Sequence, residues 1–295
     1  MVTFPNCKIN LGLHIVRKRP DDYHELETVF YPLPLADVLE VVGSRESGAG
    51  SQESVAGNRE PGVESREYVE DDIYFSLTGL DLEGEPENNL CIKAYRLLKQ
   101  DYPQLPAIQL YLHKAIPSGA GLGGGSSDGA FTLSLLNEKF QLEIPEKKLL
   151  EYALQLGSDC PFFIKNTPCR AKGRGEKLEP VSLDLSGYTF VLVHPGIHVN
   201  TGQAFSQLTP AAPPKPLMEI VRNPVETWKN ELKNDFEEPV CKQYPELKKI
   251  KEKLYAAGAV YASMTGSGSS FYGIFKKGSI QAKLLSSLDY HILGS

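Results

Sequence analysis

The sequence predicts an α+β protein with two domains. Its 295 residues exceed one typical hydrophobic core, so two domains are the prior expectation. Segments with strand-like alternation and segments with helical spacing occur in both halves of the chain. Each half also contains a loop of small residues, at 119–125 and at 266–270. Two such loops in two domains predict one cleft that is closed from both sides.

Composition excludes several classes of protein. The chain is 41% hydrophobic and 23% charged, which is ordinary for a globular protein. Its net charge of −6 argues against a nucleic-acid partner, because phosphate backbones are bound by basic surfaces. No apolar run approaches the length of a membrane span, so no membrane association is expected. Five cysteines without a CxxC pair, and a beginning without an export or transit signal, predict reduced thiols and a cytoplasmic location.

The first 80 residues predict three strand regions and one insertion. Residues 8–16 alternate as KINLGLHIV, and the polar side of this strand carries Lys8, Asn10 and His14, of which His14 is expected to face solvent. A turn at 20–22 and a second apolar run follow. Residues 44–67 are too polar to offset the entropy of ordering and predict a flexible insertion. This insertion is expected to lengthen a hairpin between a strand ending near Val42 and a strand at 72–80.

The segment 108–136 predicts a strand, a glycine loop and a helix. Residues 108–116 alternate as IQLYLHKAI, and Ser126 and Ser127 are expected to cap the helix that follows. Free N–H groups and the positive end of a helix dipole at such a junction make a phosphate site. A Walker motif is ruled out because Gly125 stands where its lysine would be, and the Rossmann pattern fits poorly. The alternative is a simple connecting turn, which five glycines in seven positions make entropically costly.

Downstream, helical spacing predicts helices at 88–100, capped by Asn88 or Asn89, and at 145–156. Asp159 follows the second of these, before an expected short apolar strand at 160–164. Apolar neighbours would partly desolvate this carboxylate and make it a better base, although it could also simply cap a turn. A charged turn and a further strand complete a first domain, 1–181, and leave a second domain, 182–295.

The second domain is expected to begin with a strand at 188–194. A helix containing Phe205 follows, capped by Asn200 or Thr201, and a further helix spans 245–257. Two strand-like runs flank the second loop of small residues, at 266–270.

Taken together, the motifs resemble those of the GHMP kinases. PSGAGLGGGSSDGA (117–130) resembles their phosphate-binding motif, and MTGSGSS (264–270) resembles their C-terminal glycine motif. The resemblance implies an N-terminal lobe like domain 2 of ribosomal protein S5, a ferredoxin-like C-terminal lobe, and the use of ATP and Mg²⁺. Within the superfamily, KINLGLHI, DDYHELETVF, LGSDCPFF and HPGIHVNTGQAF resemble kinases of the non-mevalonate isoprenoid route. Those enzymes phosphorylate the C2 hydroxyl of a cytidine diphosphate-linked methylerythritol.

The resemblance also implies roles for individual residues. Asp159 matches the catalytic aspartate and Lys8 its partner lysine. Tyr23 and Phe205 match an aromatic pair that sandwiches cytosine, His24 matches the residue that contacts the edge of the base, and Asn10 and Thr201 match polar contacts to the substrate. The adenine surroundings are matched by Asn89, Leu90 and Lys114. The phosphate-binding positions are Pro117, Ser118, Gly119, Ala120, Gly121, Leu122, Gly123, Gly124, Gly125, Ser126 and Ser127.

Some alternatives stay open at this point. A GHMP kinase for another alcohol, such as mevalonate or homoserine, or a non-catalytic nucleotide sensor would share much of the pattern. The metal ligands are unassigned, with Ser127 as one candidate, and the chain is expected to be a monomer or a homodimer. Two positions depart from the family pattern: Gly202 stands where proline is frequent, and Gly129 stands where alanine is usual.

Overall fold

The computed structural model describes residues 1–21, 23–43, 65–70, 72–82, 84–286, 288 and 290–294. The chain divides into two units, each built from separate stretches. The first comprises Met1–Asn6, Ala36–Ile116 and Gly124–Ile164, and the second comprises Cys7–Leu35, Pro117–Gly123 and Lys165–Ser295. Each unit combines helices with sheet, as the sequence predicts. The domain boundary expected near residue 181 stays a prediction.

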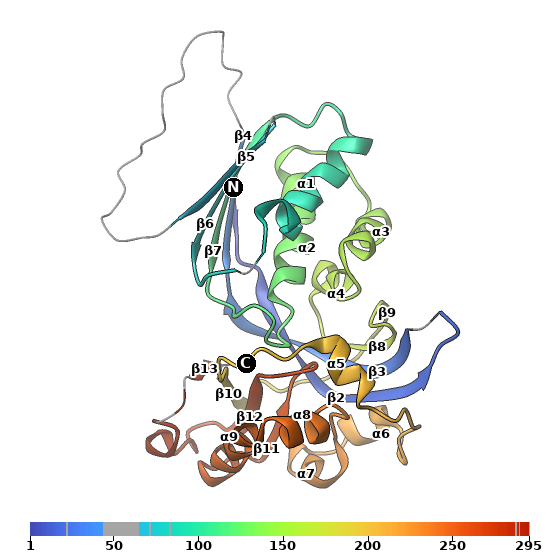
Figure 1. The fold of residues 1–295 in the computed structure, drawn as a ribbon, viewed down its shortest axis with the longest axis vertical. Helices are drawn as coiled ribbons and strands as arrows, with labels where there is room; N and C mark the ends of the chain where they lie inside the picture. The colour runs from blue at the N-terminus through green and yellow to red at the C-terminus, as the bar shows by residue number, and fades with distance from the viewer. Residues whose placement is uncertain are drawn as a thin grey trace. The chain divides into compact units, whose positions relative to one another are not determined.

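The first unit is built on a five-stranded sheet with the order β1-β4-β7-β6-β5. Its strands are β1 (Val2–Thr3), β4 (Val38–Gly43), β5 (Arg66–Glu70), β6 (Ile73–Gly79) and β7 (Ile108–Lys114). Its helices are η1 (Pro86–Asn88), α1 (Leu90–Asp101), α2 (Gly124–Lys139), α3 (Glu146–Leu156) and α4 (Cys160–Lys165). Figure 1 shows α1, α2 and α3 together on one side of this sheet. Burial alternates along β7, and Lys114 lies on its buried side.

Two expectations for this unit need correction. Strands β4 and β6 do not form a hairpin, because β7 lies between them and pairs with β4 antiparallel and with β6 parallel. Of the predicted insertion, residues 44–64 lie outside the described residues. At its predicted end, Arg66 and Glu67 already belong to β5, where Arg66 pairs with Leu77 of β6.

The second unit contains a four-stranded sheet with the order β2-β3-β8-β9. Its strands are β2 (Asn6–Lys18), β3 (His24–Ala36), β8 (Cys169–Gly173) and β9 (Lys177–Pro180). The β3–β8 register places Leu26 opposite Gly173. Both sides of β2 are buried over most of its length, so the solvent exposure expected for His14 is wrong: its exposed fraction is 5%.

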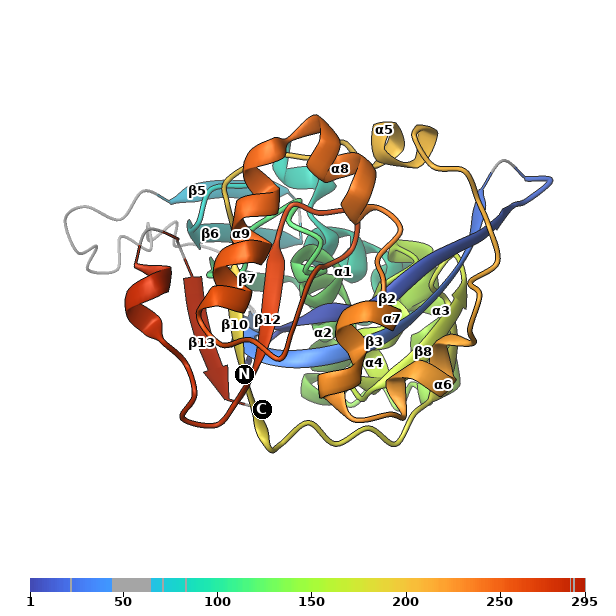
Figure 2. The ribbon, with the colours of Figure 1, turned by 90° about the horizontal axis from the view of Figure 1, so that it is seen from below.

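A second sheet of this unit is antiparallel and has the order β11-β12-β10-β13. Its strands are β10 (Tyr188–Val193), β11 (Tyr261–Met264), β12 (Phe271–Lys276) and β13 (Tyr290–Gly294). The helices of the unit are α5 (Thr201–Ser206), α6 (Leu217–Val221), η2 (Val225–Thr227), α7 (Trp228–Glu231), α8 (Glu237–Gln243), α9 (Pro245–Ala256) and η3 (Ala282–Leu285). Figure 2 shows α8 and α9 in front of strand β12. Their apolar side chains share one core with β10, β12 and the middle of β2.

Among the described residues, none of the helices is both long enough and apolar enough to span a membrane.

Candidate active site

Strand β2 brings the first predicted catalytic residue, Lys8, next to Asn10. The Lys8 Nζ donates a hydrogen bond to the Asn10 Oδ1 at 2.7 Å, and it lies 4.6 Å from the centre of the Phe30 ring. Residues two apart on a strand share a face, which explains the pairing. Both side chains are buried, with exposed fractions of 3% and 1%. Lys8 is therefore held in a defined position by its own strand.

Asn10 connects Lys8 to the second glycine loop. Its Oδ1 accepts a hydrogen bond from the Gly266 N–H at 3.1 Å, and its own N–H donates to the Thr265 Oγ1 at 3.0 Å. Its Nδ2 donates to the Thr28 Oγ1 at 3.0 Å. Both the oxygen and the nitrogen of the Asn10 side-chain amide are thus hydrogen-bonded within the protein. Its expected contact with a substrate stays a prediction.

The two glycine loops lie against each other within the second unit. The Ser270 N–H donates to the Ala120 carbonyl at 3.3 Å, and the Thr265 hydroxyl donates to the Gly121 carbonyl at 3.2 Å. A Cβ on Gly121 would lie 2.2 Å from the Thr265 carbonyl oxygen, and the φ of Gly121 is +77°. Glycine is required here both for the close approach and for the backbone conformation. The loops that the sequence singled out form one backbone-lined structure.

The helix after the glycine loop begins earlier than expected. Gly124 and Gly125 are already helical, so Ser126 and Ser127 lie in the first turn of α2, and the prediction that they cap it is wrong. The Ser127 Oγ is buried without a hydrogen-bond partner among the residues that the structure describes. The free N–H groups of this first turn and the helix dipole favour an anion here.

Lys114 forms a buried ionic cluster, and its expected place near adenine stays a prediction. Its Nζ contacts a carboxylate oxygen of Asp37 and lies 2.6 Å from the Asp128 Oδ2. The Asp37 Oδ1 accepts hydrogen bonds from the N–H groups of Ala115 and Ile116, at 2.6 and 2.8 Å. The cluster therefore fastens the end of β7 to the N-terminal part of α2. Sequence analysis missed Asp37 and Asp128, and only the position of Asp128 directly after the two serines could have indicated one of them.

The charges in this cluster do not balance, because one ammonium faces two carboxylates. Burial, with a smaller contribution from Asp37, raises the pKa of Asp128 to about 8. Burial alone would lower the pKa of Lys114, but the attraction of the two carboxylates outweighs it, and the pKa of Lys114 is raised overall. The Asp128 Oδ1 is buried without a hydrogen-bond partner among the described residues, which adds to the cost of ionising this carboxyl group.

Asp159, the second predicted catalytic residue, lies half-buried in the turn between α3 and α4. Its carbonyl oxygen accepts a hydrogen bond from the Phe162 N–H at 3.2 Å. The strand expected after Asp159 is wrong: residues 160–165 form the short helix α4, whose first turn tolerates Pro161. The adjacent Cys160 thiol interacts with the Ser126 side chain, while burial raises the pKa of this thiol to about 12. The Asp159 turn is thereby connected to the first turn of α2.

The expected base-binding aromatics are partly brought together. The rings of His24 and Phe205 stack with centroids 4.8 Å apart and an interplanar angle of 19°. Tyr23 is 54% exposed, and the Arg174 guanidinium lies 4.7 Å from its ring centre. The Thr201 hydroxyl, in the first turn of α5, hydrogen-bonds the Ser267 hydroxyl at 3.0 Å. Thr201 therefore contacts the second glycine loop.

The predicted adenine contacts Asn89 and Leu90 lie at the beginning of α1. The Asn89 Oδ1 caps this helix by accepting a hydrogen bond from the Cys91 N–H at 2.9 Å. A Cβ on Gly129 of α2 would lie 2.9 Å from the Leu90 Cβ. The close approach of α1 and α2 thus explains why glycine, and not alanine, occupies position 129.

Comparisons with known proteins agree with this geometry. Residues 89–166 match the GHMP kinases N terminal domain, and residues 218–291 match the GHMP kinases C terminal domain. A 4-diphosphocytidyl-2-C-methyl-D-erythritol kinase of Bacteroides fragilis is 52% identical over 275 residues, which cover 93% of this chain and 92% of that protein. The enzyme of the same name from Bacteroides thetaiotaomicron is 48% identical over 278 residues, covering 94% and 92%.

A solved structure gives the same result at the level of the fold. The crystal structure of a 4-(cytidine 5'-diphospho)-2C-methyl-D-erythritol kinase matches with a TM-score of 0.78 and 29% identity, and the match covers 100% of both chains. The expected GHMP kinase fold is therefore confirmed. This chain belongs to the 4-diphosphocytidyl-2-C-methyl-D-erythritol kinase family of the GHMP kinases.

Proposed function

We propose that this protein transfers the γ-phosphate of ATP to the C2 hydroxyl of 4-diphosphocytidyl-2-C-methyl-D-erythritol, in the non-mevalonate route to isopentenyl diphosphate. The observation that carries the proposal is the similarity to enzymes of that name over 92–94% of both chains. The paired glycine loops support it, because phosphoryl transfer needs chiefly positioning and charge neutralisation.

Two residues are proposed to act on the reacting groups. Asp159 accepts the proton of the attacking hydroxyl, which makes its oxygen a better nucleophile. Lys8 places a positive charge where negative charge develops on the transferred phosphoryl group. The hydrogen bond between Lys8 and Asn10 supports this role, because it fixes the direction of a long and otherwise flexible side chain.

The nucleotide is proposed to bind along residues 117–127 by its phosphates and beside Asn89 and Leu90 by its adenine. Lys114 is also proposed to lie in the adenine surroundings, where its two internal ion pairs hold its ammonium group. Ser127 is a suitable ligand for Mg²⁺, since its buried hydroxyl lacks a partner among the described residues. The part of the chain that the structure describes contains no group of three or more His, Cys, Asp or Glu side chains that could hold a metal ion. We therefore propose that Mg²⁺ is bound mainly by phosphates and water. The ion would neutralise charge on the phosphates.

The second substrate is proposed to bind by its cytosine between Tyr23 and Phe205, with His24 at the edge of the base. Stacking on aromatic rings combined with hydrogen bonds to the base edge is a general way to bind an isolated base. The exposed ring of Tyr23 and the stacked pair of His24 and Phe205 support this assignment. Asn10 and Thr201 are proposed to provide further polar contacts.

Release of ADP with a series of alcohols tests the proposal. The series contains the cytidine diphosphate-linked methylerythritol, the same alcohol without the nucleotide, mevalonate and homoserine. We expect turnover only with the nucleotide-linked compound. Comparable turnover with mevalonate or homoserine would place the protein with other GHMP kinases, and ATP binding without any turnover would indicate a sensor.

A further inference from the structure

Residues 234–237, with the sequence Asn-Asp-Phe-Glu, follow α7 and end at the first residue of α8. We infer that this segment, here named the NDFE segment, positions three parts of the proposed site at once. These parts are the second glycine loop, strand β2 with Lys8, and the ring pair His24–Phe205. The inference rests on the proposed function, and each contact that carries it lies within the second unit.

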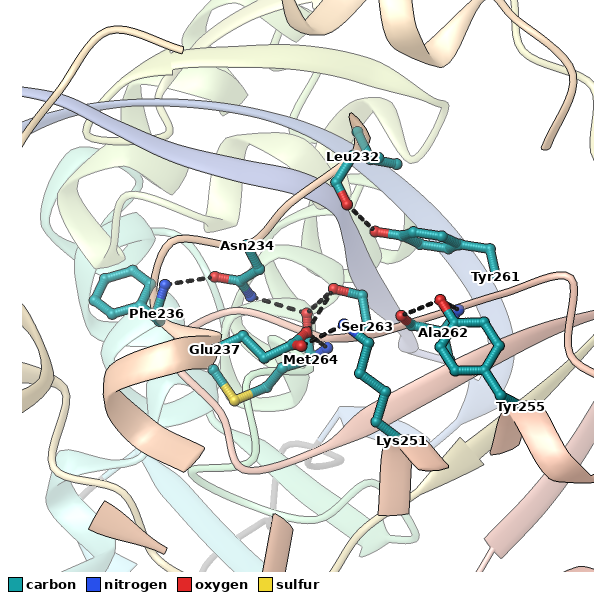
Figure 3. A network of polar contacts seen from close by, with 10 residues as sticks. All are labelled: Leu232, Asn234, Phe236, Glu237, Lys251, Tyr255, Tyr261, Ala262, Ser263 and Met264. Carbon is teal, nitrogen blue, oxygen red and sulfur yellow. Dashed lines mark hydrogen bonds and ion pairs between the residues drawn. The ribbon is translucent and has the colours of Figure 1, made fainter. Parts of the chain in front are cut away.

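Asn234 holds the backbone at the beginning of the second glycine loop (Figure 3). Its Nδ2 donates hydrogen bonds to the carbonyl oxygens of Met264 and Gly266, at 2.8 and 2.9 Å. Its Oδ1 accepts a hydrogen bond from the Phe236 N–H at 3.0 Å. The side chain is buried, so water cannot readily replace these bonds.

Glu237 holds the same backbone from α8. Its Oε2 accepts hydrogen bonds from the Met264 N–H at 2.9 Å and from the Ser263 hydroxyl at 3.1 Å. Its Oε1 forms an ion pair with Lys251 of α9 (Figure 3). Asn234 therefore binds the carbonyl of Met264, and Glu237 binds its N–H. Together they fix the two peptide groups on either side of Met264 as the chain enters the loop.

Asp235 fastens the segment to β2. The Asp235 N–H donates to the Leu13 carbonyl at 2.8 Å, and the Asp235 Oδ2 accepts from the Ile15 N–H at 2.8 Å. The other carboxylate oxygen lies 3.2 Å from the His14 Nδ1. These contacts place the strand that carries Lys8 and Asn10 in register with the residues that hold the loop.

Phe236 reaches the aromatic pair. Its ring packs edge-on against Phe205, with centroids 4.8 Å apart and an interplanar angle of 88°. Phe205 in turn stacks on His24. Edge-to-face packing constrains both the position and the tilt of a ring. A four-residue segment thus contacts the proposed base pocket and the proposed phosphate loop together.

The first test replaces Asn234 by Asp, which keeps the size of the side chain but replaces the NH₂ group, the donor of both bonds, by an oxygen that faces two carbonyl oxygens. We expect kcat/KM for ATP to fall roughly 10- to 100-fold, because small displacements of positioning groups are costly. The matched control is Lys251→Gln, which removes the ion pair of Glu237 and leaves the bonds to Met264. It should lower the melting temperature but change both KM values and kcat by less than about twofold.

The second test replaces Phe236 by Leu, which keeps an apolar side chain and removes the ring edge. We expect KM for the cytidine-linked substrate to rise about tenfold while KM for ATP stays unchanged. Kinetics are normalised to the folded fraction measured by circular dichroism. If each variant loses activity only in proportion to unfolding, or if Lys251→Gln shows the same kinetic changes, the inference is wrong. Turnover of the unaltered protein with the cytidine-linked substrate tests the proposed function independently.

Discussion

Lys114 lies with its ammonium between two buried carboxylates, those of Asp37 and Asp128. A single buried cation cannot compensate two anions, so one of the acids gains a proton more easily than it would in water. The structure places this imbalance on Asp128, whose pKa is raised to about 8, mainly by burial. The proposed nucleotide site therefore begins beside a group that changes charge close to physiological pH.

The first prediction concerns this carboxyl and the free energy of unfolding. Its pKa is about 8 in the folded protein and 3.8 ordinarily, so the folded state binds the proton more tightly. The free energy of unfolding should therefore fall as pH rises from about 4 to about 8, and this contribution should then level off. Asp128→Asn mimics the protonated form and should flatten that part of the profile. Urea unfolding between about pH 5 and pH 9 measures it, and an unchanged slope in the variant would contradict the assignment.

The second prediction concerns Asp159. Asp159→Asn keeps the size of the side chain but removes a proton acceptor, so kcat should fall by about 10²- to 10⁴-fold. Binding of both substrates should persist, because the phosphates and the base are bound elsewhere. Single-turnover kinetics with calorimetric binding separate the two effects. Asp184→Asn is a suitable control, since this exposed carboxylate takes part in local hydrogen bonds with Ser186. Unchanged turnover in Asp159→Asn would exclude it as the base.

At the scale of elements, the two glycine loops depend on backbone contact. Gly121 has a φ of +77°, and a Cβ there would lie 2.2 Å from the Thr265 carbonyl oxygen. Gly278 has nearly the same φ, +76°, but a Cβ there would meet nothing within 4 Å. Substituting alanine at Gly121 and at Gly278 therefore separates two contributions to the loss of stability. One is the unfavourable backbone conformation, and the other is the steric clash with a neighbouring loop.

The third prediction uses this pair. Gly278→Ala should lower the free energy of unfolding by about 1–2 kcal/mol through its backbone conformation alone. Gly121→Ala should cost roughly a further 1–3 kcal/mol, because the new methyl group pushes the loops apart. It should also lower kcat/KM, which Gly278→Ala should not do. Denaturant unfolding and steady-state kinetics of both variants test this, and equal losses would show that the loops do not need their close contact.

Across the whole molecule, the cysteine side chains of both units are buried or half-buried. All five are free thiols, and four of them are buried. Burial raises the pKa of Cys169 to about 12 and that of the half-buried Cys241 to about 11. The reactive thiolate is therefore scarce at neutral pH.

The fourth prediction follows from these thiols. A thiol reagent such as Ellman's reagent should modify the native protein slowly at about pH 8, with Cys241 first, because it is the least buried. Full reaction should need a denaturant. Mass spectrometry of partly modified protein identifies the site. Rapid modification of Cys160 in the native state would mean that the Asp159 turn opens more readily than its burial indicates.

Local patterns in the amino-acid sequence predicted the kind and order of most elements near the site. Alternation predicted β7, helical spacing predicted α3, and small residues between two strand-like runs predicted the loop between β11 and β12. These patterns are readable because each depends on residues a few positions apart. The shared motifs likewise indicated the family that the comparisons confirmed.

Contacts between segments that are far apart in the sequence could not be predicted from local patterns. The insertion of β7 between β4 and β6, and the pairing of Asp37 with Lys114, depend on strand neighbours that no local pattern specifies. The Nδ1 of the buried His14 lies 3.2 Å from a carboxylate oxygen of Asp235, a residue 221 positions away. Burying a polar group costs less free energy when a hydrogen-bond partner lies beside it. Whether a polar side chain is buried therefore depends on a partner that folding brings beside it. The residues next to it in the sequence do not show which residue that partner is.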